Sequence, residues 1–127
     1  MIVDSSAIVA ILTEEPEALA FASAITNADA RISAGNWIEL AAVTSRRRLC
    51  TAEELDQLRT RFGLTIESVT AEQAGIGQAA YRSFGIGSGH PARLNFGDCF
   101  AYALAKATGE PLLFKGDDFV HTDIPRV

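Results

Sequence analysis

The feature that most constrains this chain is the junction at its start, where the apolar run Met1–Val3 stops at Asp4. The run is too short for a helix, and the small hydroxyl residues after Asp4 open a new apolar pattern with helical spacing. The pattern therefore predicts a strand, then a carboxylate, then a helix. In an open α/β sheet such a junction lies at the carboxyl end of a strand, where ligands bind.

The rest of the chain continues this alternation of strands and helices. The predicted helices are Pro16 to about Asn27, Trp37–Cys50 with Asn36 as cap, a capping-box helix from Thr51 to Gly63, a second capping-box helix from Thr70, and Asn95 to Gly109. The predicted strands are Ala30–Ala34, a half-buried Leu64–Val69 and a buried Leu112–Phe114, with an edge strand near Ile124. A long loop, Gly85–Leu94, precedes the last helix, and loops of this length are usually functional or mobile.

Length and composition favour one domain over residues 1–127. The chain has 127 residues and 48% hydrophobic content, enough for one core. It carries no basic leader and no apolar stretch near the roughly 20 residues that a bilayer span needs, so we expect a cytoplasmic protein with no membrane segment. Cys50 and Cys99 are expected to be buried free thiols. The net charge of −5 argues against binding nucleic acid by global electrostatics, but it is compatible with a metal site.

Acidic residues occur at four comparable structural positions. Asp4 follows the first strand, Glu39 lies early in a helix, Asp98 lies in the first turn of a helix, and Asp117 and Asp118 follow the last buried strand. Each acid has an ordinary explanation by itself: a first-turn acid complements the helix dipole, a helical Glu is commonly solvated, and paired Asp residues form turns. Their conjunction favours function, because clustered carboxylates without His or Cys select Mg²⁺ or Mn²⁺. Such ions support phosphodiester hydrolysis by an activated water.

These residues resemble a known family, the PIN domain, and within it the VapC-type toxins of bacterial type II toxin-antitoxin systems. The resemblance rests on four stretches: Ile2–Ala7, Glu39 in its helix, Asn95–Ala105 and Leu112–Phe119. Their order and spacing fit the family across the whole chain. The resemblance implies a three-layer αβα fold, with a central, mostly parallel sheet between helices, and Mg²⁺- or Mn²⁺-dependent endoribonuclease activity.

The resemblance also implies roles for single residues. Asp4, Glu39 and Asp98 match the acids that form the family's metal site, and a fourth acid comes from the terminal motif. Because Phe114–Phe119 departs from the commoner family pattern at this point, either Asp117 or Asp118 can be the fourth acid; Asp117 is favoured, with Asp118 in support. Ser6 matches a hydroxyl expected to orient Asp4 or to bond a metal-bound water.

Basic residues near the acids are candidate RNA contacts. Arg46 lies seven residues after Glu39, nearly on the same helix face, and Arg93 lies in the long loop. Lys115 stands beside the terminal acids, where it can offset their charge or reach a phosphate. The resemblance further implies homodimerisation and a VapB-like antitoxin whose C-terminal segment covers the acidic groove, and a basic amphipathic peptide suits such a groove.

Two other functions compete with the ribonuclease. A haloacid-dehalogenase-like phosphatase also uses an Asp after the first strand, but its chemistry normally needs a second Asp two residues later, where this chain has Ser6. The other alternative is a non-catalytic binding module whose acids hold a structural cation or a peptide. RNA cleavage by the purified protein separates these alternatives.

Overall fold

The computed structural model describes residues 1–127 and contains one four-stranded sheet in which every pair of neighbours is parallel. The strands run in the order β3, β2, β1, β4. Their bounds are β1 Ile2–Val3, β2 Arg31–Ser33, β3 Thr65–Glu67 and β4 Leu112–Leu113. Ile2 pairs with Arg31 on one side and with Leu112 on the other, so β1 is central. The tail forms only a single parallel bridge, Leu112 to Arg126, where an edge strand was predicted.

Six helices surround this sheet. They are α1 Ser5–Leu12, α2 Ala18–Thr26, α3 Ala34–Arg46, α4 Ala52–Phe62, α5 Ala71–Phe84 and α6 Phe96–Thr108. The predicted capping box opens α4, and Gly63 and Gly109 end α4 and α6 in the left-handed conformation, with φ of 61° and 68°. Glycine adopts this conformation without a Cβ clash, which explains why both helices end where they do.

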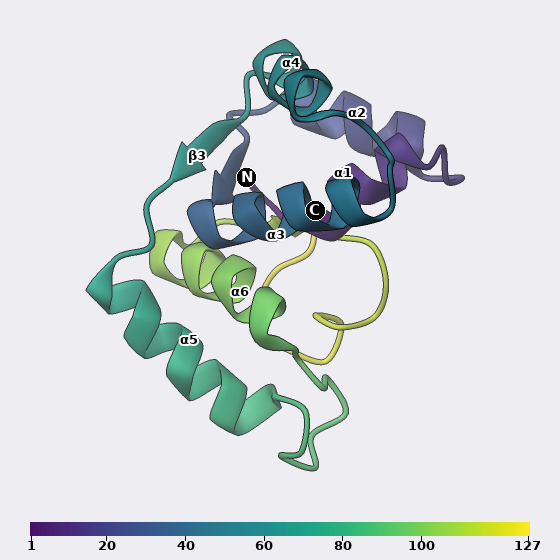
Figure 1. Ribbon diagram of the computed structural model, residues 1–127. Helices are drawn as coiled ribbons and strands as arrows, with labels where there is room; N and C mark the ends of the chain where they lie inside the picture. The colour runs from purple at the N-terminus through teal and green to yellow at the C-terminus, as the bar shows by residue number, and fades with distance from the viewer.

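The sheet separates two apolar cores, because successive strand residues point to opposite faces. Ile2 and Leu112 pack with residues of α5 and α6, whereas Val3 and Leu113 pack with residues of α1 to α4. Figure 1 shows α5 running along the outer side of α6 and α3 crossing the middle of the molecule. Helices α2 and α4 lie together at the top of the view, opposite α5. This arrangement confirms the three-layer αβα fold.

Several local predictions differ from the structure. The cap of α3 is Ser33, whose side chain accepts a hydrogen bond from the Gly35 N–H, so Asn36 lies inside the helix and is fully buried. Strand β3 lies at the edge of the sheet, and Thr65 and Ile66 are exposed, so it is less buried than the predicted half-buried strand. At α5 only half of the predicted capping box forms, with Thr70 accepting from the Gln73 N–H.

Two further observations concern the thiols and the helices. Cys50 and Cys99 are free but only half-buried, whereas full burial was predicted. None of the helices combines the length and the apolar character that crossing a bilayer requires.

The topology places a crevice at the carboxyl end of β1. From β1 the chain passes to β2 and β3 on one side, and it returns much later to form β4 on the other. Ligands in open α/β sheets bind at such a switch point. The segments leaving β1, β2 and β4 therefore meet at one edge of the sheet.

Candidate metal centre

Asp4 stands at the end of β1 and is the N-cap of α1. Its Oδ2 accepts a hydrogen bond from the Ser6 N–H at 2.9 Å, which satisfies one of the free amides of the first turn. Only 3% of the residue is exposed. The capping geometry thus fixes a buried carboxylate at the switch point of the sheet.

Glu39 reaches the same place from α3, which packs against α1 on one side and α6 on the other. Its Oε2 accepts from the Ser5 hydroxyl at 2.7 Å and from the Asn36 side-chain amide at 3.2 Å. Its carboxylate also lies against Gly97 of α6, where an added Cβ would stand 2.1 Å from Oε1. Gly97 is therefore the residue that leaves room for Glu39.

Asp98 belongs to the capping box of α6. Its Oδ2 accepts from the Asn95 N–H at 2.8 Å, and its own N–H donates to Asn95 Oδ1 at 2.9 Å. The residue is 6% exposed. The first-turn position expected from the sequence is thus real, but the carboxylate is buried rather than solvated.

Burial and neighbouring negative charges raise the pKa of both Asp4 and Asp98. Burial raises the pKa of Asp4 to about 6 against the hydrogen bonding by Ser6, and the charges of Glu39 and Asp118 add to the rise. Burial likewise raises the pKa of Asp98 to about 7, with further contributions from Asp4, Asp118 and Glu39. Asp4 and Asp98 thus both respond to the charges of Glu39 and Asp118, as expected when carboxylates from separate elements lie near one another.

The terminal acids Asp117 and Asp118 are both exposed, on the segment that follows β4. Asp118 is the one whose charge raises the pKa of both Asp4 and Asp98. Its own pKa is raised by burial and by the neighbouring charge of Asp117. Electrostatically, Asp118 is thus the terminal acid coupled to the buried pair, although the sequence favoured Asp117.

Asn36 is the site residue that sequence reasoning missed. Its Nδ2 lies 3.4 Å from Asp4 Oδ1, 3.2 Å from Glu39 Oε2 and 3.0 Å from the Gly97 carbonyl oxygen, as a donor to each. Its position three residues before Glu39, and hence on the same helix face, was a signal in the sequence. Because the sequence predicts Asn36 as the helix cap, it does not predict that Asn36 shares a helix face with Glu39.

The hydroxyl of Ser6 contacts the segment after β4, and its hydrogen bonding also lowers the pKa of Asp4. Its Oγ accepts from the Lys115 N–H at 3.0 Å, and this bond ties the start of α1 to the chain just before Asp117 and Asp118. The Ser6 backbone orients Asp4, as described above. The residue therefore links two of the acid-bearing segments.

None of the three candidate RNA contacts forms an ion pair with the predicted site acids. Lys115 Nζ is 2.6 Å from Glu17 Oε1 and 3.3 Å from Glu15 Oε2, so it offsets those charges and not the charges of the terminal acids. The hydrogen bond to Glu17 raises the pKa of Lys115. Arg46 is exposed in the last turn of α3, and Arg93 is exposed in the long loop with a left-handed φ of 51°. No ion pair of the structure involves Asp4, Glu39 or Asp98.

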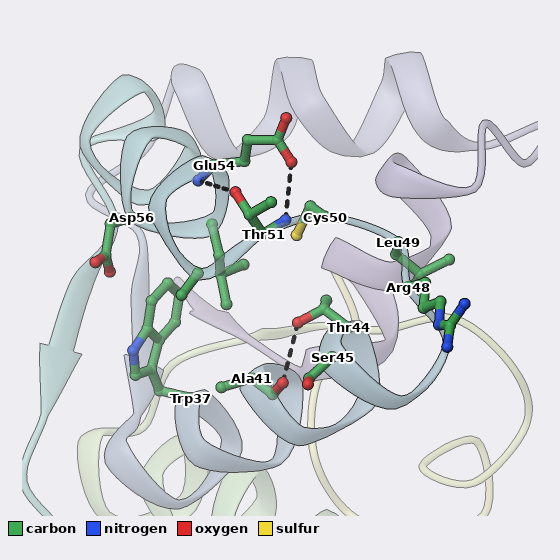
Figure 2. A pocket seen from close by; sticks show the side chains of 12 residues that line it. Trp37, Ala41, Thr44, Ser45, Arg48, Leu49, Cys50, Thr51, Glu54 and Asp56 are labelled. Atoms are coloured by element: carbon green, nitrogen blue, oxygen red, sulfur yellow. Dashed lines mark hydrogen bonds between the residues drawn. The ribbon is translucent and has the colours of Figure 1, made fainter.

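Glu39 faces a cleft of about 360 Å³ between α3 and α6. The other residues of this Glu39 cleft are Gly35, Ile38, Phe96, Gly97 and Phe100. A separate cleft of about 510 Å³ lies between the end of α3 and the start of α4, where Trp37, Thr44 and Cys50 line its wall (Figure 2). It contains none of the predicted site acids, and its Glu54 is engaged in the capping box of α4. Of these two clefts, only the Glu39 cleft is lined by one of the predicted site acids.

The donor set fits a hard divalent cation. No three His, Cys, Asp or Glu side chains are close enough together to hold an ion by themselves. Mg²⁺, however, commonly binds through one or two carboxylates and keeps several waters. Asp4 and Asp98 supply two buried carboxylates with no cationic partner. The Asn36 amide donates to both Asp4 and Glu39, which links Glu39 to this site.

Comparisons with known proteins agree with this geometry. The family model of the PIN domain matches residues 1–125. VapC ribonuclease Mb2780c of Mycobacterium bovis is 52% identical over 98% of this chain and 96% of its own length, and Ribonuclease VapC28 of Mycobacterium tuberculosis is 51% identical over 99% and 96%.

Solved structures share the fold at low sequence identity. The crystal structure of Mycobacterium tuberculosis VapC20, described as a sarcin-ricin loop cleaving toxin, superposes with a TM-score of 0.72 at 19% identity, covering 99% of this chain and 97% of that one. A toxin-antitoxin complex from Klebsiella pneumoniae gives a TM-score of 0.70 at 15% identity over 96% and 92%. By its family match and its close relatives, the chain belongs to the PIN domain family, in the branch of the VapC proteins.

Proposed function

We propose that this chain is an endoribonuclease that hydrolyses RNA phosphodiester bonds and acts as the toxin of a VapBC-type pair. The observation that carries the proposal is the convergence of Asp4 and Asp98, both buried and without a cationic partner, with Glu39 at the switch point of a parallel sheet. Relatives with 51–52% identity over nearly the whole chain are named ribonucleases, which supports the same activity here.

Asp4 and Asp98 are the proposed cation ligands, with Glu39 near the same ion, and Mg²⁺ or Mn²⁺ is the proposed ion. When bound, a divalent ion supplies charge stabilisation at the phosphate and increases the acidity of water. Glu39 lines the Glu39 cleft, and Ser5 and Asn36 bind its Oε2 and leave Oε1 without a hydrogen-bond donor, so the carboxylate can accept a proton from a water there. We propose Asp118 rather than Asp117 as the fourth acid, because its charge raises the pKa of both buried carboxylates.

The phosphatase alternative loses support from the family match, which spans residues 1–125. The non-catalytic binding module remains the alternative to be tested.

The test incubates purified protein with single-stranded RNA and Mg²⁺ or Mn²⁺, with and without EDTA. We expect cleavage that EDTA abolishes and that Asp4→Asn and Asp98→Asn each remove, whereas Glu72→Gln, an exposed acid of α5, leaves it unchanged. Intact RNA across many substrates, with the wild-type protein folded, would favour the binding module.

We also propose two protein partners. One is a VapB-like antitoxin, whose basic amphipathic segment would suit the acidic site and the apolar wall of the Glu39 cleft. The other is a second copy of this chain, since Ile38 is 70% and Phe96 77% exposed on neighbouring helices, and exposed apolar patches commonly mark interfaces. RNA contacts by Arg46 and Arg93, a cytoplasmic location and a single domain over residues 1–127 stay predictions of the sequence.

A further inference from the structure

We propose that Asn36 is a positioning residue that sets the geometry of the acidic site, and through it the affinity for the cation. The inference rests on the proposed function, since it assumes that Asp4 and Glu39 serve a divalent ion. Its basis is one side-chain amide that reaches three segments carrying the site: the end of β1, helix α3 and the first turn of α6.

The contacts of Asn36 all come from one nitrogen. Nδ2 is 3.4 Å from Asp4 Oδ1, 3.2 Å from Glu39 Oε2 and 3.0 Å from the carbonyl oxygen of Gly97. An amide nitrogen carries only two hydrogens, so the three acceptors share them. A shift of any one segment therefore changes the hydrogen bonds to the other two.

The orientation of the amide is fixed by its surroundings. A rotation that exchanged nitrogen and oxygen would place Oδ1 against three oxygen acceptors, two of them carboxylates. In the observed orientation Oδ1 is buried and has no hydrogen-bond partner. An unpaired buried acceptor costs about 1–3 kcal/mol. Asn36 is thus a poor choice for stability alone, and its donor contacts to the acids are what distinguish it from an apolar residue.

Asn36 acts through other residues and does not touch the substrate. It is 0% exposed, so RNA in the Glu39 cleft cannot contact it. Removing its amide would leave Asp4 with the Ser6 N–H and Glu39 with the Ser5 hydroxyl as their remaining hydrogen-bond donors. Both carboxylates would then lose the connection that holds them in register with each other and with α6.

The test is Mn²⁺ binding by Asn36→Ala, measured by electron paramagnetic resonance, which needs no RNA and no turnover. Loss of a residue that orients metal ligands costs about 10–100-fold in affinity or activity, so we expect the Mn²⁺ Kd to rise at least tenfold. With RNA, kcat should fall while KM stays unchanged. Asn36→Ser, which keeps a shorter donor, should give an intermediate Kd and serves as the comparison where the Ala variant does not fold.

Thr44→Ala is the matched control on the same helix. Thr44 is 2% exposed, and its hydroxyl donates only within α3, to the carbonyl oxygens of Leu40 and Ala41. Its loss perturbs a buried polar group of α3 without touching the acids, so the Mn²⁺ Kd should not change. An equal rise of the Mn²⁺ Kd in Thr44→Ala and Asn36→Ala would show that Asn36 acts only through the packing of α3. That result would overturn the inference.

A measurement on the wild-type protein removes any dependence on variants. The side-chain amide resonances of Asn36 should shift during titration with diamagnetic Mg²⁺. The midpoint of these shifts should equal the midpoint of the Mg²⁺ binding curve. Saturable shifts elsewhere with none at Asn36 would overturn the inference and leave the metal site intact. Wild-type protein that binds neither Mn²⁺ nor Mg²⁺ would instead refute the proposed function, so the two failures are distinguishable.

Discussion

Gly97→Ala provides a sharp test of the site, because it changes the space available to Glu39 and little else. An added Cβ at position 97 would lie 2.1 Å from Glu39 Oε1, 2.6 Å from Cδ and 2.8 Å from Oε2. Comfortable non-bonded contacts begin near about 3.5 Å, so the carboxylate must withdraw by about 1 Å or more. The group that moves is the end of a flexible side chain, and the backbone of Gly97 has no left-handed φ that Ala would resist.

The expected changes in stability and in activity are of different size. Withdrawal of Glu39 weakens its bonds to Ser5 and Asn36, each worth roughly 1.5–3 kcal/mol, but the half-exposed carboxylate regains water in exchange. Ala also improves helix propensity by up to about 1 kcal/mol, and by less in the first turn, where Gly97 lies. Hydrogen bonds to water replace most of the energy of the lost bonds, and the gain in helix propensity offsets part of the remainder, so the unfolding temperature should fall by only a few degrees. Misplacing a catalytic group by about 1 Å costs on the order of 100-fold in rate.

The assay compares kcat/KM for RNA cleavage and the thermal unfolding temperature of Gly97→Ala with those of Gly75→Ala. Gly75 lies in α5, and a Cβ there meets nothing within 4 Å. That control should be as active as wild type and more stable by up to about 1 kcal/mol, or roughly 3–5 °C. Gly97→Ala should be about 100-fold less active. Wild-type activity in a folded Gly97→Ala protein would refute the placement of Glu39 in the catalytic site.

The remaining predictions concern charge and assembly. Because the folded-state pKa values of Asp4 and Asp98 are raised from 3.8 to about 6 and about 7, the folded state binds more protons than the unfolded state between these limits. The stability of the metal-free protein should therefore fall as the pH rises from about 4 to 7, and Mg²⁺ should restore it; thermal unfolding in EDTA that shows a rise instead contradicts the burial of these acids. Asp118→Asn should lower cleavage more than Asp117→Asn, and the reverse order would return the fourth position to Asp117. Phe96→Ser should shift the molar mass measured by light scattering from dimer towards monomer, whereas a wild-type protein that is already monomeric argues against the proposed second copy.

The fold was predictable wherever a local signal marked a boundary. The strand that ends at Asp4, the capping box at Thr51 and the terminal Gly109 all lie where the sequence placed them. Position 36 was misassigned because Asn is a good cap in isolation, while the competing Ser33 is the last residue of a strand whose end is set by pairing in the sheet. Strand Thr65–Glu67 shows the same limit, since alternation alone does not reveal that the strand lies at the edge of the sheet.

The candidate site was predictable in its residue types but not in its connections. Asp4, Glu39 and Asp98 were identified from their places relative to strands and helices. The bond between Ser5 and Glu39, the space at Gly97 and the three contacts of Asn36 join residues more than thirty positions apart, except for Asn36 and Glu39. Such contacts depend on how helices α1, α3 and α6 pack, and the packing angle leaves no local trace in the sequence. The pairing of Lys115 with Glu15 and Glu17 is of the same kind.

The central place of β1 has a consequence for the timing of activity during synthesis. Strand β1 is translated before β4, and it needs β4, more than a hundred residues later, to complete its hydrogen bonding at Ile2 and Val3. Asp118 follows β4, so the acids are complete only when nearly all of residues 1–127 have been translated. A nascent chain would therefore carry Asp4 and Glu39 without a finished site. For the proposed ribonuclease, we therefore expect cleavage activity only after Asp118 has been translated and β4 has paired with β1.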